Sequence, residues 1–172
     1  RHIAKSFIDA GASVFICARN KKDLGNTVEM LVSRAQGKQL VRYLPADISD
    51  GSQIEHLVNV VLNEFPQLEI LVNNAGIYGP KGPIEAIDWA EWLHTIQTNL
   101  IGTVDLCRRL IPHLKKRRYG KIINLSGGGA TNPLPFFSAY AASKAAVVRF
   151  TETLAEEVKK FHIDVNAVAP GL

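Results

Sequence analysis

Residues 70–76 read Ile-Leu-Val-Asn-Asn-Ala-Gly, a short apolar run that ends in two amide side chains, an alanine and a glycine. A continuous apolar run of this length is typical of a strand that is buried on both faces of a parallel sheet. Similar runs begin at Val14, Leu40, Ile122 and Ile163, and helical patterns lie between them. This alternation predicts an α/β fold with a doubly wound parallel sheet and helices on both faces.

Hydrophobic periodicity and capping residues set the expected elements. The expected strands are 14–18, 40–44, 70–72, 122–125 and 163–169, and the expected helices are 1–10, 21–36, 51–65, 89–118 and 138–161. Ser49 or Asp50 is suited to cap the helix that begins at residue 51. These elements predict one Rossmann-like domain over residues 1–172.

Composition limits the class of protein. The 172 residues are 47% hydrophobic and 21% charged, as expected of one globular domain. No apolar stretch approaches the roughly 20 residues that a membrane helix needs, so we expect no membrane contact. The two cysteines, Cys17 and Cys107, lack the spacing of metal ligands. We therefore expect no bound metal and two buried thiols in a reducing, cytoplasmic setting.

The positive charge has a simple explanation. The formal net charge is +4, and the one dense basic run covers residues 115–118, at the end of an expected helix. Cations at a helix C-terminus complement its dipole and stay in solvent. We therefore expect no nucleic-acid partner.

Ligands of open parallel sheets bind outside the carboxyl ends of the strands. At these ends the chain carries Gly, Asn, Asp and Ser, which bond a ligand or let a backbone approach one. The segments are 18–20, 46–48, 73–76, 126–128 and 170–171. The sequence therefore predicts one ligand site along this edge.

Four motifs occur in order at these positions: Asn73-Asn74-Ala75-Gly76, Asn99 in a long helix, Tyr140-x-x-x-Lys144, and Pro170-Gly171. Together they resemble the short-chain dehydrogenase/reductase family over nearly the whole chain. The resemblance implies an NAD(P)-dependent oxidoreductase. Such an enzyme moves a hydride between nicotinamide and a small carbonyl or secondary-alcohol substrate.

The chemistry of the Tyr–Lys pair agrees with its spacing. Tyr140 and Lys144 lie one helical turn apart and share a helix face. A phenol has a pKa near 10, and a nearby ammonium favours the phenolate, so we expect Lys144 to lower the pKa of Tyr140. The resemblance implies that Tyr140 is the acid/base, that Lys144 also binds the nicotinamide ribose, and that Asn99 supports a proton relay.

The same resemblance implies the cofactor contacts. Asp47 and Ile48 would border the adenine, and the Asn-Asn-Ala-Gly segment (Asn73, Asn74, Ala75, Gly76) would line the cofactor, as would Pro170 and Gly171. Members that prefer NAD carry an acidic residue at the end of the second family strand, where this chain has Ala18 followed by Arg19. A guanidinium suits a 2′-phosphate, so we expect NADP rather than NAD.

The chain departs from the family at the catalytic serine, thirteen residues before the Tyr, where it has Gly127. Three interpretations stay open. Ser126 turns into the site, Thr131 or Ser138 substitutes, or the protein has little dehydrogenase activity. Ser126 should point to the opposite face of its strand unless the glycines let it turn.

Two other functions compete with the oxidoreductase. Gly127 favours a dinucleotide-binding protein with little or no catalysis, acting as a scaffold or sensor. A relative of the sugar-nucleotide epimerases would share the Tyr and Lys, but the Asn-Asn-Ala-Gly motif disfavours it.

By the same resemblance we expect the domain to be incomplete at both ends. The first strand with its Gly-rich turn and the C-terminal substrate region would lie outside residues 1–172. We also expect a homodimer or homotetramer formed through helices 89–118 and 138–161, whose apolar residues cover wide arcs. The residues seen here do not name the substrate.

Overall fold

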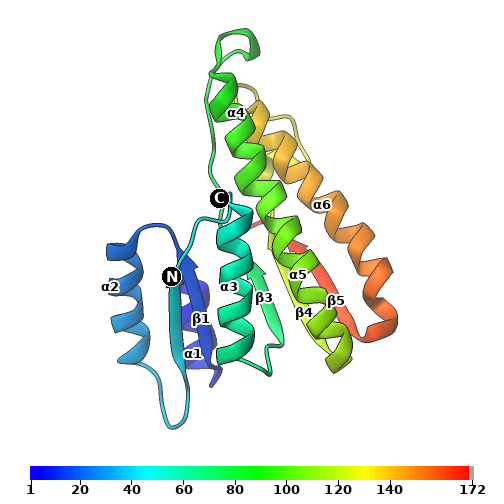
Figure 1. The fold of residues 1–172 in the computed structure, drawn as a ribbon. Coiled ribbons are helices and arrows are strands. Elements are labelled where there is room, and N and C mark those ends of the chain that lie inside the picture. The colour runs from blue at the N-terminus through cyan, green and yellow to red at the C-terminus, as the bar shows by residue number, and fades with distance from the viewer. Residues whose placement is uncertain (171–172) are drawn as a thin grey trace.

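The computed structural model describes residues 1–170, and the expected strands are all present (Figure 1). The strands are β1 (Val14–Ala18), β2 (Val41–Pro45), β3 (Ile70–Asn73), β4 (Gly120–Leu125) and β5 (Ile163–Val168). The helices are α1 (His2–Asp9), α2 (Lys21–Val32), α3 (Gly51–Glu64), α4 (Trp89–Ile96), α5 (Gly102–Arg117) and α6 (Ser138–Val158). The parallel α/β architecture predicted from the sequence is confirmed.

Within the described residues the strands form two parallel sheets. β1 pairs with β2, with Val14 opposite Val41. β3, β4 and β5 form the second sheet in that order, with Leu71 opposite Ile122 and Ile122 opposite Val165. The carboxyl ends of all five strands therefore face the same edge, because parallel strands joined by helices run in one direction.

Helix α3 joins the two sheets. Its buried residues Ile54, Leu57 and Val58 belong to a cluster that also takes Phe15 from β1, Leu44 from β2 and Leu71 from β3. In Figure 1, α3 lies between β1 and β3. Apolar burial on one helix thus holds together strands that share no hydrogen bond.

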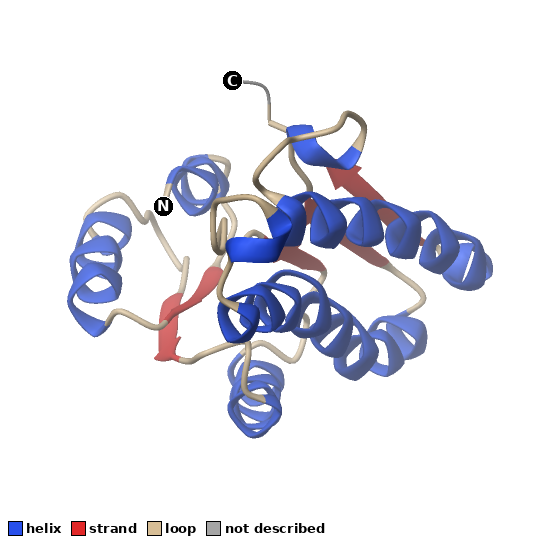
Figure 2. Cartoon of the chain, turned by 90° about the horizontal axis from the view of Figure 1, so that it is seen from above, coloured by secondary structure: helices blue, strands red, loops and turns tan. Residues whose placement is uncertain are grey.

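The opposite face of the small sheet is covered by α1 and α2. Val14 and Ile16 of β1 pack with Ile8 of α1 and Leu31 of α2, whereas Phe15 faces α3. Successive side chains on a strand point to opposite faces, so β1 is covered on both. Figure 2 shows the strands lying between helices. On the larger sheet, α5 and α6 pack against β4 and β5 around Cys107, Ile122 and Val158.

Three expected helices differ from those observed. The predicted helix 89–118 is interrupted by a π-helical turn over Gln97–Ile101, between α4 and α5. The predicted helix 21–36 ends at Val32, and the predicted helix 138–161 ends at Val158 before a 3₁₀ turn over Lys159–Phe161. The π turn is a local widening that hydrophobic periodicity does not reveal.

The prediction that both cysteines are buried is half wrong. Cys107 is fully buried, and burial raises the pKa of its thiol to about 12. Cys17 is exposed. It lies near the carboxyl end of β1, which has β2 on one side and no other strand partner among the described residues.

A chain of buried hydrogen bonds links β3, β4 and α6. The side-chain amide of Asn73 donates to Asn124 Oδ1 at 2.8 Å, and the Asn124 amide donates to Thr151 Oγ1 at 2.9 Å. Thr151 donates in turn to the carbonyl of Val147 at 2.7 Å. Buried polar groups are costly when unpaired, so this chain fixes the relative position of the three elements.

We predict that Asn124→Ala lowers the free energy of unfolding by roughly 2 to 4 kcal/mol, because it leaves the Asn73 amide and the Thr151 hydroxyl without these partners. Chemical denaturation followed by circular dichroism measures the change. Asn166→Ala on neighbouring β5 is the control, since Asn166 is exposed. Equal losses in the free energy of unfolding for the two substitutions would contradict the role of these buried hydrogen bonds.

Candidate active site

The side chain of Asn99 organises one end of the larger sheet. Asn99 lies in the π turn and is 1% exposed. Its Oδ1 accepts from the Ile77 backbone N–H at 2.8 Å, and its Nδ2 donates to the Ile77 carbonyl at 2.8 Å and to Ser143 Oγ at 3.0 Å. One amide therefore joins the segment after β3, the π turn and α6.

Lys144 points into the same place from α6. It is 5% exposed, and its Nζ donates to the Leu125 carbonyl at the end of β4 at 2.6 Å. Burial lowers the pKa of Lys144. A Cβ on Gly76 would stand 3.3 Å from Asn99 Oδ1 and 3.4 Å from Lys144 Nζ. Gly76 therefore leaves open the space beside both side chains.

Tyr140 lies one turn before Lys144 on α6, with Lys144 Nζ 5.8 Å from the centre of its ring. Burial raises the pKa of Tyr140, and a charge on the neighbouring Tyr78 would raise it further. The expectation that Lys144 lowers this pKa is therefore wrong for this structure. Its ammonium is bonded to the Leu125 carbonyl instead of the phenol oxygen.

Gly127 lies directly against the hydroxyl of Tyr140. A Cβ built on Gly127 would overlap Tyr140 Oη, so this residue holds the position that faces the phenol. Ser126 Oγ is buried and has no hydrogen-bond partner within residues 1–170. The site therefore presents a glycine to Tyr140, and no bond from Ser126 reaches the phenol.

The two other hydroxyls considered from the sequence are placed differently. Ser138 Oγ accepts from the Trp92 indole N–H at 3.1 Å, which commits it to the contact between α4 and α6. Thr131 is exposed, and its Oγ1 accepts a long contact of 3.4 Å from Asn132. Neither makes a hydrogen bond to Tyr140 in the described part of the chain.

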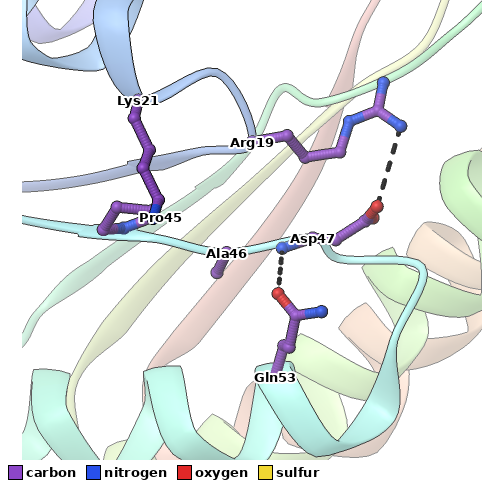
Figure 3. Close-up of a pocket in the computed structure, with 6 residues that line it drawn as sticks. All are labelled: Arg19, Lys21, Pro45, Ala46, Asp47 and Gln53. Atoms are coloured by element: carbon purple, nitrogen blue, oxygen red, sulfur yellow. Dashed lines mark hydrogen bonds and ion pairs between the residues drawn. The ribbon is translucent and has the colours of Figure 1, made fainter.

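A second cluster forms where β1 and β2 end. Arg19, Lys21, Pro45, Ala46, Asp47 and Gln53 line an open cavity of about 370 Å³ (Figure 3). Arg19 Nη1 lies 3.7 Å from Asp47 Oδ2, and the Arg19 side chain is half exposed. Gln53 Oε1 accepts from the backbone N–H of Asp47 at 2.9 Å and holds the loop after β2.

The carboxylate of Asp47 is held in place by its own loop. Its Oδ1 accepts from the Ser49 backbone N–H at 2.8 Å and from the Ser49 hydroxyl at 2.7 Å. Burial acts to raise the pKa of Asp47, but these bonds and the charge of Arg19 hold it below its usual value. Ile48, next to it, is buried, and its carbonyl lies against Gly102 at the start of α5.

The remaining predicted residues lie along the same edge. Asn73 is buried in the hydrogen-bonded chain described above, whereas Asn74, Ala75 and Gly76 are exposed just after β3. Pro170 is exposed after β5. Gly171 lies outside the described residues.

Sequence reasoning missed four neighbours of the site. Ser143 bonds Asn99, Tyr78 lies against Tyr140, and Lys21 and Gln53 line the second cavity. Ser143 was accessible to sequence reasoning, since it precedes Lys144 and lies three residues after Tyr140 on one helix. Tyr78 follows the Asn-Asn-Ala-Gly segment by two residues, but its contact depends on the path of a loop.

Two structural features bear on other functions. None of the helices within residues 1–170 is long and apolar enough to cross a membrane. In the same part of the chain, no group of three His, Cys, Asp or Glu side chains is arranged to hold a metal ion.

Comparison with known proteins identifies the family. Residues 1–172 match the short chain dehydrogenase family, and the chain belongs to it. It is 37% identical over 131 residues to the 3-ketodihydrosphingosine reductase of Bacteroides thetaiotaomicron, covering 76% of this chain and 48% of that protein. It is 34% identical over 171 residues to the 3-oxoacyl-[acyl-carrier-protein] reductase FabG of Haemophilus influenzae, covering 99% and 68%.

The fold agrees with solved structures. A metagenomic short-chain oxidoreductase in complex with NADP superposes with a TM-score of 0.92 and 30% identity, covering 99% of this chain and 76% of that one. This confirms the Rossmann-like α/β fold. The chain spans about half the length of several curated relatives that it matches.

Proposed function

We propose that this chain is the dinucleotide-binding and catalytic part of an NADP-dependent oxidoreductase that acts on a carbonyl or secondary alcohol. The observation that carries the proposal is that Asn99 and Lys144 border the space left open by Gly76, with Lys144 Nζ 5.8 Å from the centre of the Tyr140 ring. A polar cluster at the carboxyl edge of a parallel sheet is where a dinucleotide binds in this architecture.

The residues fit the cofactor by their chemistry. NADPH, when bound, supplies the hydride for the carbonyl carbon. Tyr140 donates the proton that the carbonyl oxygen needs and takes it back in the reverse reaction. Lys144, whose Nζ lies beside Gly76, is suited to hold the nicotinamide ribose. Asn99 positions the segment after β3 through both polar groups of Ile77.

Arg19 and Lys21 support NADP over NAD. Both line the cavity at the ends of β1 and β2, and Ala18 provides no carboxylate there (Figure 3). The guanidinium of Arg19 can offer a planar pair of donors to a 2′-phosphate, and Lys21 begins helix α2, whose N-terminus favours an anion. Asp47 is close enough to orient Arg19 toward this cavity.

We propose a homodimer or homotetramer formed through α4, α5 and α6. Three large apolar side chains lie on this surface. Trp89 and Leu93 of α4 and Ile101 of the π turn are 60%, 48% and 44% exposed, and a second copy of the chain would bury them. Light scattering should give the mass of at least two chains, and Leu93→Glu should reduce it. Lys22→Glu on α2 is the control and should leave the mass unchanged. A monomeric parent protein would contradict this proposal.

Replacing Tyr140 by Phe should slow turnover sharply without loss of cofactor binding. Phe keeps the ring and removes the proton donor, so we expect a fall of about 10²- to 10⁴-fold in kcat. The assay follows NADPH absorbance with acetophenone, cyclohexanone, 2-octanone and ethyl acetoacetate. NADPH affinity is measured separately by fluorescence. Tight NADPH binding with no reduction of any ketone by the parent protein would favour the non-catalytic dinucleotide binder.

Replacing Arg19 by Ala should weaken NADPH binding by about 10- to 100-fold and change NADH binding little, because it removes a charge-assisted bond to the 2′-phosphate. Fluorescence titration of both cofactors measures the difference. Arg42→Ala is the control, since Arg42 of β2 pairs with Glu64 outside this cavity. Equal losses for the two cofactors would count against a 2′-phosphate contact.

A further inference from the structure

The loop after β3 holds Tyr78 between fixed neighbours. On one side, the N–H and carbonyl of Ile77 are both bonded to the Asn99 side chain. On the other, Gly79 has a φ of +71° and packs so closely on the buried Thr95 that a Cβ there would overlap its hydroxyl. Further along, the Gly82 N–H donates to the Phe136 carbonyl at 3.0 Å. The backbone at Tyr78 is therefore preorganised.

The side chain of Tyr78 is placed against the reacting phenol. Its ring centre lies 4.9 Å from that of Tyr140 at a tilt of 40°, and 6.0 Å from that of Phe137. Tyr78 is nevertheless 64% exposed. One part of the ring thus contacts Tyr140, while the rest borders open space beside it.

The electrostatics of Tyr140 agree with this ring contact. Burial raises the pKa of Tyr140, and a charge on Tyr78 raises it as well. The ammonium of Lys144 is bonded to the Leu125 carbonyl. Tyr78 is therefore a hydroxyl-bearing side chain whose ring contacts Tyr140.

A carbonyl oxygen that becomes an alkoxide is stabilised by preorganised hydrogen-bond donors. Gly127 offers no hydroxyl, Ser138 is bonded to Trp92, and Ser126 makes no bond to Tyr140. We propose that the substrate oxygen accepts one hydrogen bond from Tyr140 and a second from the Tyr78 hydroxyl. Tyr78 would thus replace the serine that the family has at the position of Gly127. This inference rests on the proposed function.

The step balances without any further reactant. NADPH would supply the hydride for the carbonyl carbon, and the carbonyl oxygen, left with the C=O π electrons, would take the Tyr140 proton. Tyr78 keeps its own proton throughout and only donates a hydrogen bond. Solvent later returns a proton to Tyr140.

Tyr78→Phe in the full-length protein tests the role of this hydroxyl. Phe preserves the ring contact with Tyr140, so a lost hydrogen bond should lower kcat for ketone reduction by about 10²-fold, and NADPH affinity should not change. The alkaline fall in reduction rate should also move to lower pH. Tyr140 must be protonated to donate, and removing Tyr78 removes one cause of its raised pKa.

Tyr119→Phe is the matched control, because Tyr119 is an exposed tyrosine at the opposite end of β4. Full activity in Tyr78→Phe, with loss only in Tyr78→Leu, would overturn the proposal and make Tyr78 an apolar wall. Full activity in Tyr78→Phe, with loss in Tyr140→Phe, would overturn this proposal alone. A parent protein that binds NADPH but reduces none of the four ketones would overturn the proposed function along with it.

Discussion

Three hydrogen bonds from the Asn99 side chain position most of the candidate site. They fix both polar groups of Ile77, and through Ser143 they reach α6, where Ser143 Oγ also donates to the Tyr140 carbonyl at 2.7 Å. The π turn that contains Asn99 departs from regular helical hydrogen bonding, and such turns are frequent at functional sites. One buried amide therefore links the segment that carries Tyr78 to the helix that carries Tyr140 and Lys144.

Much of the fold was predictable from the sequence because the strands are continuous apolar runs. Val14–Ala18 was predicted to the residue, and the Asp50 cap of α3 accepts from the N–H groups of Ser52 and Gln53 as expected of an N-cap. The π turn was not foreseen, because hydrophobic periodicity does not reveal such a local widening.

The membership of the site was predictable from motifs, but its geometry was not. Tyr140 and Lys144 lie together as their spacing suggested, and Asn99 lies beside Lys144 as the resemblance implied. The pKa of Tyr140 is raised, whereas the sequence predicted that it would be lowered. Lys144 donates to the Leu125 carbonyl, and Tyr140 is partly buried beside a second phenol. Gly127 was identified by counting from Tyr140, and only the structure shows that the phenol hydroxyl fills the space where its side chain would begin.

The two halves of the site belong to different sheets. The cavity with Arg19 and Asp47 forms at the ends of β1 and β2, whereas Tyr140 and Lys144 face the ends of β3 and β4. A dinucleotide that spans both halves needs them at a fixed separation. α3 provides this by packing on both sheets, and the contact of Ile48 with Gly102 ties the Asp47 loop to the helix that follows Asn99. The residues proposed for cofactor choice and those proposed for proton transfer thus belong to different sheets, and the apolar packing of α3 links them.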